Sequence, residues 1–222
     1  MAIVFTDLAE TCAPTVAVET LAAVISLESS FQPFDIRINS GPPLSRQPKS
    51  KAEAIEAATT LIAKHQDIQL GLGGIGIEEL AKLNLTISDA FDPCVNLKAT
   101  ATLLDGYYRL AISAGALSAQ AERVMLQSYY GRSNPSVGEM VQYDAQVQRE
   151  ATRLSARLAS LTIGQDPDAQ DASNAQALET SSNATVGSSQ RSAAKTPSWD
   201  VFNATRHSAA LVFQNDQPEQ PE

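Results

Sequence analysis

Apolar residues recur at helical spacing over most of residues 5–160. Val18, Leu21 and Ile25 follow one another at steps of three and four, which predicts a helix with Thr15 as its N-cap that ends before Pro33. Similar spacing predicts further helices over residues 5–12, 51–64, 78–83, 95–114 and 118–128. The pattern therefore indicates a mainly α fold.

The last apolar stripe begins near Ser136 and predicts one long helix. Its apolar residues are separated by steps of three, four and seven: Met140, Val147, Leu154, Leu158 and Leu161. A helix with a single apolar stripe buries that stripe against a neighbour. We expect this helix to pack along the outside of the domain or against a partner helix.

Two segments without helical periodicity lie between the predicted helices. Residues 34–47 contain a turn cluster and are predicted to be irregular, forming a wall beside the preceding helix. Downstream, Gly71, Gly73, Gly74 and Gly76 place four glycines in six positions. Such a backbone bends sharply or allows a ligand to approach closely. It lacks the Gly-Lys-Ser/Thr ending of a phosphate-binding loop.

Glu28 continues the apolar row of the helix that contains Leu21 and Ile25. Burying an ionised carboxylate is costly, so a buried glutamate is protonated instead, through a raised pKa. A carboxylic acid that stays protonated near neutral pH is a candidate general acid. The alternative is a glutamate at the helix end whose carboxylate reaches water or caps a backbone group.

The chain of 222 residues is long enough for one domain with a real core and a tail. A net charge of −9 argues against nucleic acid or an anionic membrane surface as the main partner. No apolar run approaches the roughly 20 residues of a membrane span. Cys12 and Cys94 match no metal-ligand spacing; they form a disulfide in an oxidising compartment or remain two buried thiols. We expect no metal and no other cofactor.

The composition changes at Gly164. Residues 164–222 are rich in Ala, Ser, Gln, Asp and Pro and contain few large apolar side chains. Such a segment cannot bury enough apolar surface to offset the entropy lost on ordering. We therefore expect a domain over residues 1–163 and a disordered polar tail over residues 164–222. Two apolar segments of the tail, residues 198–202 and 209–213, are candidate docking segments for partner proteins.

Three short motifs occur in the order found in one family. Residues 28–33, Glu-Ser-Ser-Phe-Gln-Pro, resemble the Glu-Ser-x-Phe-x-Pro motif of lysozyme-like lytic transglycosylases. Residues 71–75, Gly-Leu-Gly-Gly-Ile, are similar to that family's Gly-Leu-x-Gln-Ile, and residues 128–131, Ser-Tyr-Tyr-Gly, to its Ala/Ser-Tyr-Asn-x-Gly. Cys12 and the segment 91–97 around Cys94 resemble, more specifically, the lytic transglycosylase subunit of type IV secretion systems.

This resemblance implies a lysozyme-like helical domain that cleaves the β-1,4 bond between N-acetylmuramic acid and N-acetylglucosamine in peptidoglycan. Glu28 would protonate the glycosidic oxygen, and its carboxylate would then take the proton of the muramic 6-hydroxyl as a 1,6-anhydro ring closes. Ser29 would orient Glu28 or contact sugar. The hydroxyl of Tyr129, or of Tyr130 after a one-residue shift, would hydrogen-bond the carboxylate. The resemblance implies these substrate-binding residues: Ser29, Gly71, Leu72, Gly73, Gly74, Ile75, Tyr129 and Tyr130.

The chain departs from the family pattern at two positions, since the glutamine of the second motif is Gly74 here and the asparagine of the third is Tyr130. The resemblance implies action on peptidoglycan glycan strands in the periplasm, opening the cell wall for a type IV secretion channel whose components bind the tail. That oxidising location favours a disulfide between Cys12 and Cys94.

No standard signal peptide is expected in the sequence as written, because residues 1–7 lack a basic region. The alternative function is a catalytically weak, peptidoglycan-binding assembly factor of the secretion machine that acts through its C-terminal tail.

Overall fold

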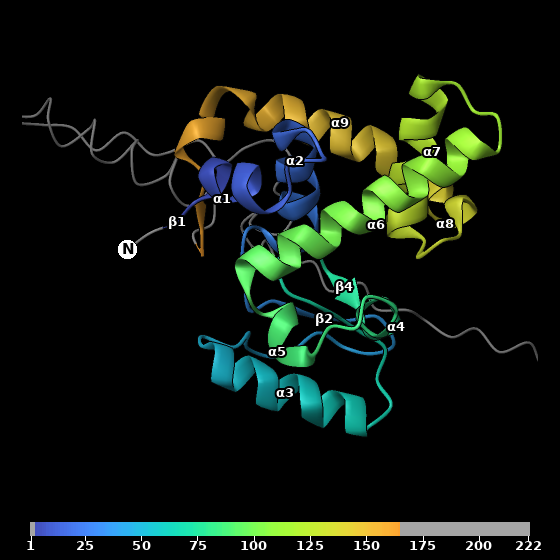
Figure 1. The fold of residues 1–222 in the computed structure, drawn as a ribbon. Coiled ribbons are helices and arrows are strands. Elements are labelled where there is room, and N and C mark those ends of the chain that lie inside the picture. The colour runs from blue at the N-terminus through green and yellow to red at the C-terminus, as the bar shows by residue number, and fades with distance from the viewer. Residues whose placement is uncertain (1–2, 165–222) are drawn as a thin grey trace, which may run out of the picture. The chain divides into compact units, whose positions relative to one another are not determined.

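The computed structural model describes residues 3–164, and these residues are mainly helical (Figure 1). The α-helices are α1 (Phe5–Cys12), α2 (Val18–Ser29), α3 (Lys51–Ala63), α4 (Ile77–Lys82), α5 (Ile87–Ala90), α6 (Pro93–Ser113), α7 (Ser118–Tyr130), α8 (Pro135–Met140) and α9 (Tyr143–Leu154). A 3-10 helix, η1 (Ser155–Ser160), follows α9. The short strands are β1 (Ile3–Val4), β2 (Ile36–Ile38), β3 (Ile68–Leu70), β4 (Ile75–Gly76) and β5 (Thr162–Ile163). The predicted mainly α fold is confirmed.

The described residues form two apolar clusters that meet at the glycine-rich turn. The first cluster joins α1, α2, α6, α7 and α9, and it includes Leu72 from the turn. The second joins the sheet to α3, α4 and α5, and it includes Leu70 and Ile75 from the strands on either side of the turn. Burial of these three side chains therefore holds the turn in place from both sides.

Strands β2, β3 and β4 form an antiparallel sheet in that order. Gln69 of β3 lies opposite Gly76 of β4, and Arg37 of β2 lies opposite Gln69. The prediction that residues 34–47 are wholly irregular is wrong, since β2 lies within them. Three residues are too few for a strand to show a periodic pattern in the sequence.

Helix ends follow local capping chemistry. Ser50 caps α3 by accepting from the Glu53 amide, and Asp92 caps α6 by accepting from the Val95 amide. Because Pro93 occupies the first turn of α6, where its missing N–H is not needed, the helix begins two residues earlier than predicted. The prediction of Thr15 as an N-cap is wrong, because α2 begins after Ala17 without a side-chain cap.

The prediction of one long C-terminal helix is wrong. Helix α8 ends at Met140, and Gln142 adopts a left-handed conformation with φ of 53° before α9 begins. Met140 is 83% exposed, so it belongs to no buried stripe. Helix α9 packs against α2 and buries Val147 and Leu154 there (Figure 1). The break therefore brings the first residue of α9 beside the helix that carries Glu28.

Cys12 at the end of α1 and Cys94 at the start of α6 are joined by a disulfide, with their Cα atoms 5.4 Å apart. It ties together two helices that also pack against each other. Among residues 3–164, no helix is both long and apolar enough to cross a membrane. The predicted tail lies outside the described residues apart from Gly164, so the division at residues 1–163 and 164–222 stays a prediction.

Candidate active site

Glu28 lies in the last turn of α2, where its side chain is buried. The middle of the helix is buried on every side, since five successive residues from Leu21 to Ile25 are fully buried. The chain then reverses through Ser30 and Phe31, both with positive φ, and the buried Phe31 ring packs edge-on against Phe5. Glu28 itself is only 6% exposed. The alternative in which its carboxylate extends into water is therefore excluded.

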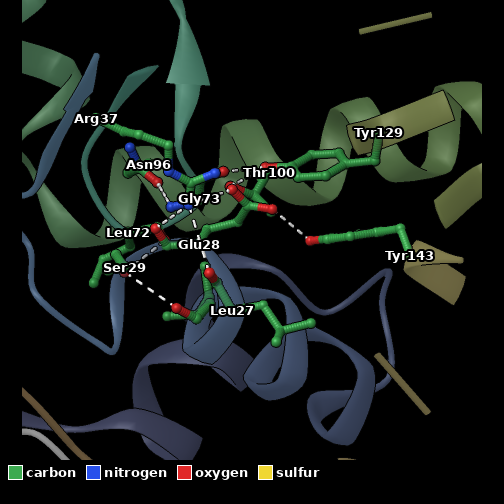
Figure 2. Close-up of polar contacts among 11 residues, drawn as sticks. Leu27, Glu28, Ser29, Arg37, Leu72, Gly73, Asn96, Thr100, Tyr129 and Tyr143 are labelled. Carbon is green, nitrogen blue, oxygen red and sulfur yellow. Dashed lines mark hydrogen bonds and ion pairs between the residues drawn. The ribbon is translucent and has the colours of Figure 1, made fainter. Parts of the chain in front are cut away.

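Two side chains from distant elements contact the Glu28 carboxyl group (Figure 2). The Tyr143 hydroxyl, from the start of α9, donates to Oε1 at 2.5 Å. Arg37 of β2 places Nη2 2.9 Å from Oε2, and it also donates to the Glu28 backbone carbonyl at 2.5 Å. One oxygen thus has a neutral donor and the other a cation.

Burial raises the pKa of Glu28 above the ordinary glutamate value of 4.5. Arg37, the Tyr143 hydrogen bond and the charge of Arg132 act in the opposite direction, and the effect of burial exceeds theirs. Burial also raises the pKa of Tyr143 well above its ordinary value, so this hydroxyl remains a donor. Glu28 can therefore hold a proton, and its carboxylate keeps two donors after the proton has left.

Asp35 is a second carboxyl group near Glu28. Burial raises its pKa to about 6, with Arg37 lowering it and the negative charge of Glu28 raising it further. Its backbone carbonyl accepts from the Gly71 amide at 2.9 Å. Asp35 lies in the segment that the sequence predicts to be irregular, where no pattern distinguishes it.

Gly74 leaves open the space in front of Oε2 of Glu28. Gly74 has φ of 62°, and a Cβ atom built there would lie 2.9 Å from that oxygen. The family's glutamine at this position would therefore collide with Glu28 on this backbone. Gly74, which lines the pocket, thus lies beside Oε2 of Glu28.

Replacing Gly74 with alanine is expected to destabilise the domain by more than the roughly 1–2 kcal/mol that a left-handed conformation costs an L-residue. The added methyl group also displaces Glu28. Gly115→Ala is the matched control, because Gly115 has φ of 93° and no atom within 4 Å of the added carbon. Thermal unfolding compares the two variants; equal losses of stability would show that Gly74 does not face the carboxyl group closely.

The other predicted residues of the turn are held inside the protein. The Ser29 hydroxyl donates to the Leu72 carbonyl at 2.7 Å, and the Gly73 amide donates to Asn96 at 2.8 Å. A Cβ atom on Gly71 or Gly73 would collide with neighbouring atoms, at 2.2 Å and 2.0 Å respectively. These glycines are therefore required by packing within the protein, and Leu72 is a core residue.

The predicted hydrogen bond between Tyr129 and Glu28 is wrong. The Tyr129 hydroxyl donates instead to the Gly73 carbonyl at 2.6 Å, deep in the core beside Thr100 (Figure 2). Burial raises the pKa of Tyr129, so it too stays a donor. Tyr130 does not take the role either, because its ring packs on that of Tyr143 with centroids 4.9 Å apart. Ser29 contacts backbone carbonyls of Ile25 and Leu72 rather than the carboxyl group.

A pocket opens beside Glu28. Its walls come from β3, β4, α4, α6, α7 and the residues after α7, and they are formed by Gln69, Gly74, Ile75, Gly76, Glu79, Leu103, Tyr107, Tyr129, Tyr130 and Arg132. A second hollow shares Gln69, Tyr130 and Arg132 with it and continues towards Arg37, Asn39 and Asp67. Of the predicted substrate-binding residues, four line the pocket: Gly74, Ile75, Tyr129 and Tyr130.

Sequence reasoning missed Tyr143, Arg37 and Arg132. Arg37 had a weak signal, since a charged residue between Ile36 and Ile38 is typical of a strand with one face towards the core. Tyr143 had none, because it lies 115 residues from Glu28. Within the part of the chain that the structure describes, no three His, Cys, Asp or Glu side chains are grouped to hold a metal ion.

The fold and the site define a mainly helical domain with a buried carboxyl group of raised pKa, that of Glu28, beside a cleft. The chain is 44% identical over 108 residues to the type IV secretion system protein VirB1 of Brucella abortus, covering 49% of this chain and 45% of that protein. It is 32% identical over 124 residues to protein VirB1 of Agrobacterium fabrum, covering 55% and 48%, and 35% identical over 105 residues to protein VirB1 of Rhizobium radiobacter, covering 47% and 43%.

Homologues of this chain are thus named VirB1, and the predicted resemblance to a type IV secretion system component is confirmed. The chain spans about half the length of the curated relatives it matches. No protein-family model and no solved structure matches it significantly. The lysozyme-like character of the fold stays a prediction.

Proposed function

We propose that this protein is a peptidoglycan lytic transglycosylase that opens the cell wall for a type IV secretion system. The observation that carries the proposal is the Glu28 carboxyl group, which is buried and has a raised pKa, with Tyr143 on one oxygen, Arg37 on the other, and the pocket residue Gly74 beside that second oxygen. The names of the relatives support the secretion setting. The substrate would be the bond between N-acetylmuramic acid and N-acetylglucosamine.

In the proposed reaction, protonated Glu28 gives its proton to the glycosidic oxygen as the bond between that oxygen and the muramic C1 breaks. The bonding electrons leave with the oxygen, and positive charge develops at C1. The muramic 6-hydroxyl oxygen then bonds to C1, and its proton returns to Glu28. The enzyme ends as it began, and the product carries a 1,6-anhydro ring.

The two contacts of Glu28 suit an acid that must afterwards act as a base. When the proton leaves, the new carboxylate accepts from the Tyr143 hydroxyl and lies beside the Arg37 guanidinium. Both contacts strengthen when the acceptor becomes charged. They therefore stabilise the carboxylate while the intermediate forms, without a second carboxylate acting as nucleophile as in the glycosidase scheme.

Digestion of purified peptidoglycan by the wild-type protein, followed by mass analysis of the soluble products, tests the reaction class. Anhydro-muropeptides are the expected products. Products with reducing ends would instead identify a hydrolase, in which Asp35 would be the first candidate for the second carboxylate. The absence of soluble products would favour the alternative function.

Replacing Tyr143 with phenylalanine is expected to lower turnover by roughly tenfold to a hundredfold, because the new carboxylate loses a donor. The Tyr143 hydrogen bond lowers the pKa of Glu28, so its loss raises that pKa further and moves the alkaline limb of the activity profile to higher pH. The pH dependence of product release measures both effects.

Tyr108→Phe is the matched control, since Tyr108 is partly buried and does not line the pocket. An unchanged pH profile in Tyr143→Phe would contradict the assigned role of Tyr143.

The alternative is an assembly factor that binds peptidoglycan but cleaves it weakly. Gly74 motivates this alternative, because the sequence has no side chain where the family has a sugar-binding glutamine. It predicts that the tail binds channel components in the periplasm and that loss of Glu28 leaves secretion intact. Deletion of residues 165–222 tests the tail, which lies outside the described residues.

A further inference from the structure

Two residues that line the pocket each carry a buried oxygen atom without a hydrogen-bond partner: Gln69 with Oε1 and Glu79 with Oε2. Gln69 lies on β3 and Glu79 in the first turn of α4. Glu79 is only 4% exposed. Buried polar atoms are rarely left without a partner, so two acceptors on one pocket require an explanation.

The backbone brings the two side chains together at Gly76. Gln69 lies directly opposite Gly76 in the antiparallel pair of β3 and β4, so a side chain at either position would lie on the same face. A Cβ atom on Gly76 would lie 2.4 Å from Oε2 of Glu79. The missing side chain at Gly76 is thus what allows Glu79 to reach the space beside Gln69.

The neighbouring cations do not satisfy Oε2 of Glu79. Lys82 approaches the other oxygen, Oε1, at 3.7 Å, and its own side chain is largely exposed. Arg132 borders the same space but pairs with Asp67 at 2.7 Å. Oε2 of Glu79 and Oε1 of Gln69 are therefore two acceptors without a partner, beside the N–H donors of the Gln69 amide itself.

We propose that Gln69 and Glu79 form an acceptor pair that binds the hydroxyl and amide N–H groups of an amino-sugar strand. The proposal rests on the proposed function, because the strand that lies against Glu28 would pass this pair in the same pocket. Gly74 supplies no side chain for polar recognition, and the acceptor pair provides it from the next strand and helix instead.

Binding of soluble peptidoglycan oligosaccharides to the full-length Glu28→Gln protein tests the pair, since this background permits binding without cleavage. Adding Glu79→Met is expected to weaken binding about tenfold, because methionine is of similar length but apolar. Adding Glu79→Gln should retain most of the binding, because glutamine keeps one acceptor oxygen. Glu78→Met is the matched control, because Glu78 is adjacent on α4 and exposed. Calorimetric titration gives the affinities.

Thermal unfolding separates recognition from a structural role. Methionine removes an unpartnered buried oxygen, so Glu79→Met should unfold at the same or a higher temperature than its parent. Weaker binding with unchanged or higher thermal stability supports the proposal. Weaker binding together with lower stability, equal affinities for Glu79→Met and Glu78→Met, or no binding by the parent would each overturn it.

The two proposals fail separately. If the wild-type protein releases no soluble products but oligosaccharide binding depends on Glu79, the proposed reaction is wrong and the acceptor pair stands. If the wild-type protein releases anhydro-muropeptides and Glu79→Met binds as tightly as its parent, the acceptor pair is wrong and the reaction stands.

Discussion

Replacing Glu28 with glutamine should lower the rate of glycan cleavage by about a thousandfold, the range that a positioned general acid contributes. Glutamine has nearly the same shape, and its single carbonyl oxygen can accept from Tyr143 or from Arg37 but not from both; its amide has no acidic proton to give and cannot take one back. Release of soluble anhydro-muropeptides by the variant measures the loss. Activity near that of the wild type would remove Glu28 from the mechanism.

The stability of the Glu28→Gln variant at different pH values tests the raised pKa of Glu28 independently of activity. A carboxyl group whose pKa is raised on folding contributes stability below its unfolded pKa and loses that contribution as the pH rises through the folded pKa. Burial raises the pKa of Glu28 above 4.5 in this way, whereas glutamine does not ionise. The stability of Glu28→Gln relative to the wild type should therefore be greater at pH 8 than at pH 4.

Melting temperatures at the two pH values measure this gain. Asp35 behaves in the same manner, with a contribution that is lost between its ordinary pKa of 3.8 and its folded value of about 6. Because the wild type and Glu28→Gln both keep Asp35, its effect largely cancels in the difference between their stabilities. A stability difference between variant and wild type that does not shift in favour of the variant from pH 4 to pH 8 would contradict the raised pKa of Glu28.

Removing the disulfide should have the largest effect on stability. The bond between Cys12 and Cys94 closes a loop with a sequence separation of 82, and the chain-entropy model gives such a crosslink roughly 4 kcal/mol. For a domain of this size the loss corresponds to a fall of roughly 10 °C in melting temperature. The double variant Cys12→Ser, Cys94→Ser tests this by thermal unfolding.

Reduction of the wild-type protein provides the matched comparison. Dithiothreitol should lower the melting temperature of the wild type to that of the double serine variant and leave the variant itself unchanged. The cleft residues are contributed largely by other elements, so cleavage at a temperature where both proteins are folded should change little. A melting temperature that does not respond to reduction would mean that the two cysteines are not bonded.

Local patterns in the sequence determined most of the helices and the central acid. The apolar spacing of α2 placed Glu28 on a buried row, and the structure buries it there. The dense glycines at residues 71–76 correctly indicated a tight turn with close approaches, and the motif order indicated the type IV secretion setting that the relatives' names share. These features depend on residues that are close together in the chain.

The tertiary structure alone decided which groups touch the acid. Tyr143 reaches Glu28 because the chain breaks at Gln142 and α9 packs on α2, and Arg37 reaches it from a strand of three residues. Tyr129, which the motif assigned to the carboxyl group, holds the glycine turn instead.

Glycine is needed for different reasons within that turn: Gly71 packs against α5 and α6, Gly73 packs against α6, and Gly74 leaves space for Glu28. Periodicity reports which face of an element is buried, whereas these contacts depend on how elements far apart in the chain pack together. That packing is set by the shapes of whole apolar clusters, so it cannot be predicted from any short stretch of the sequence.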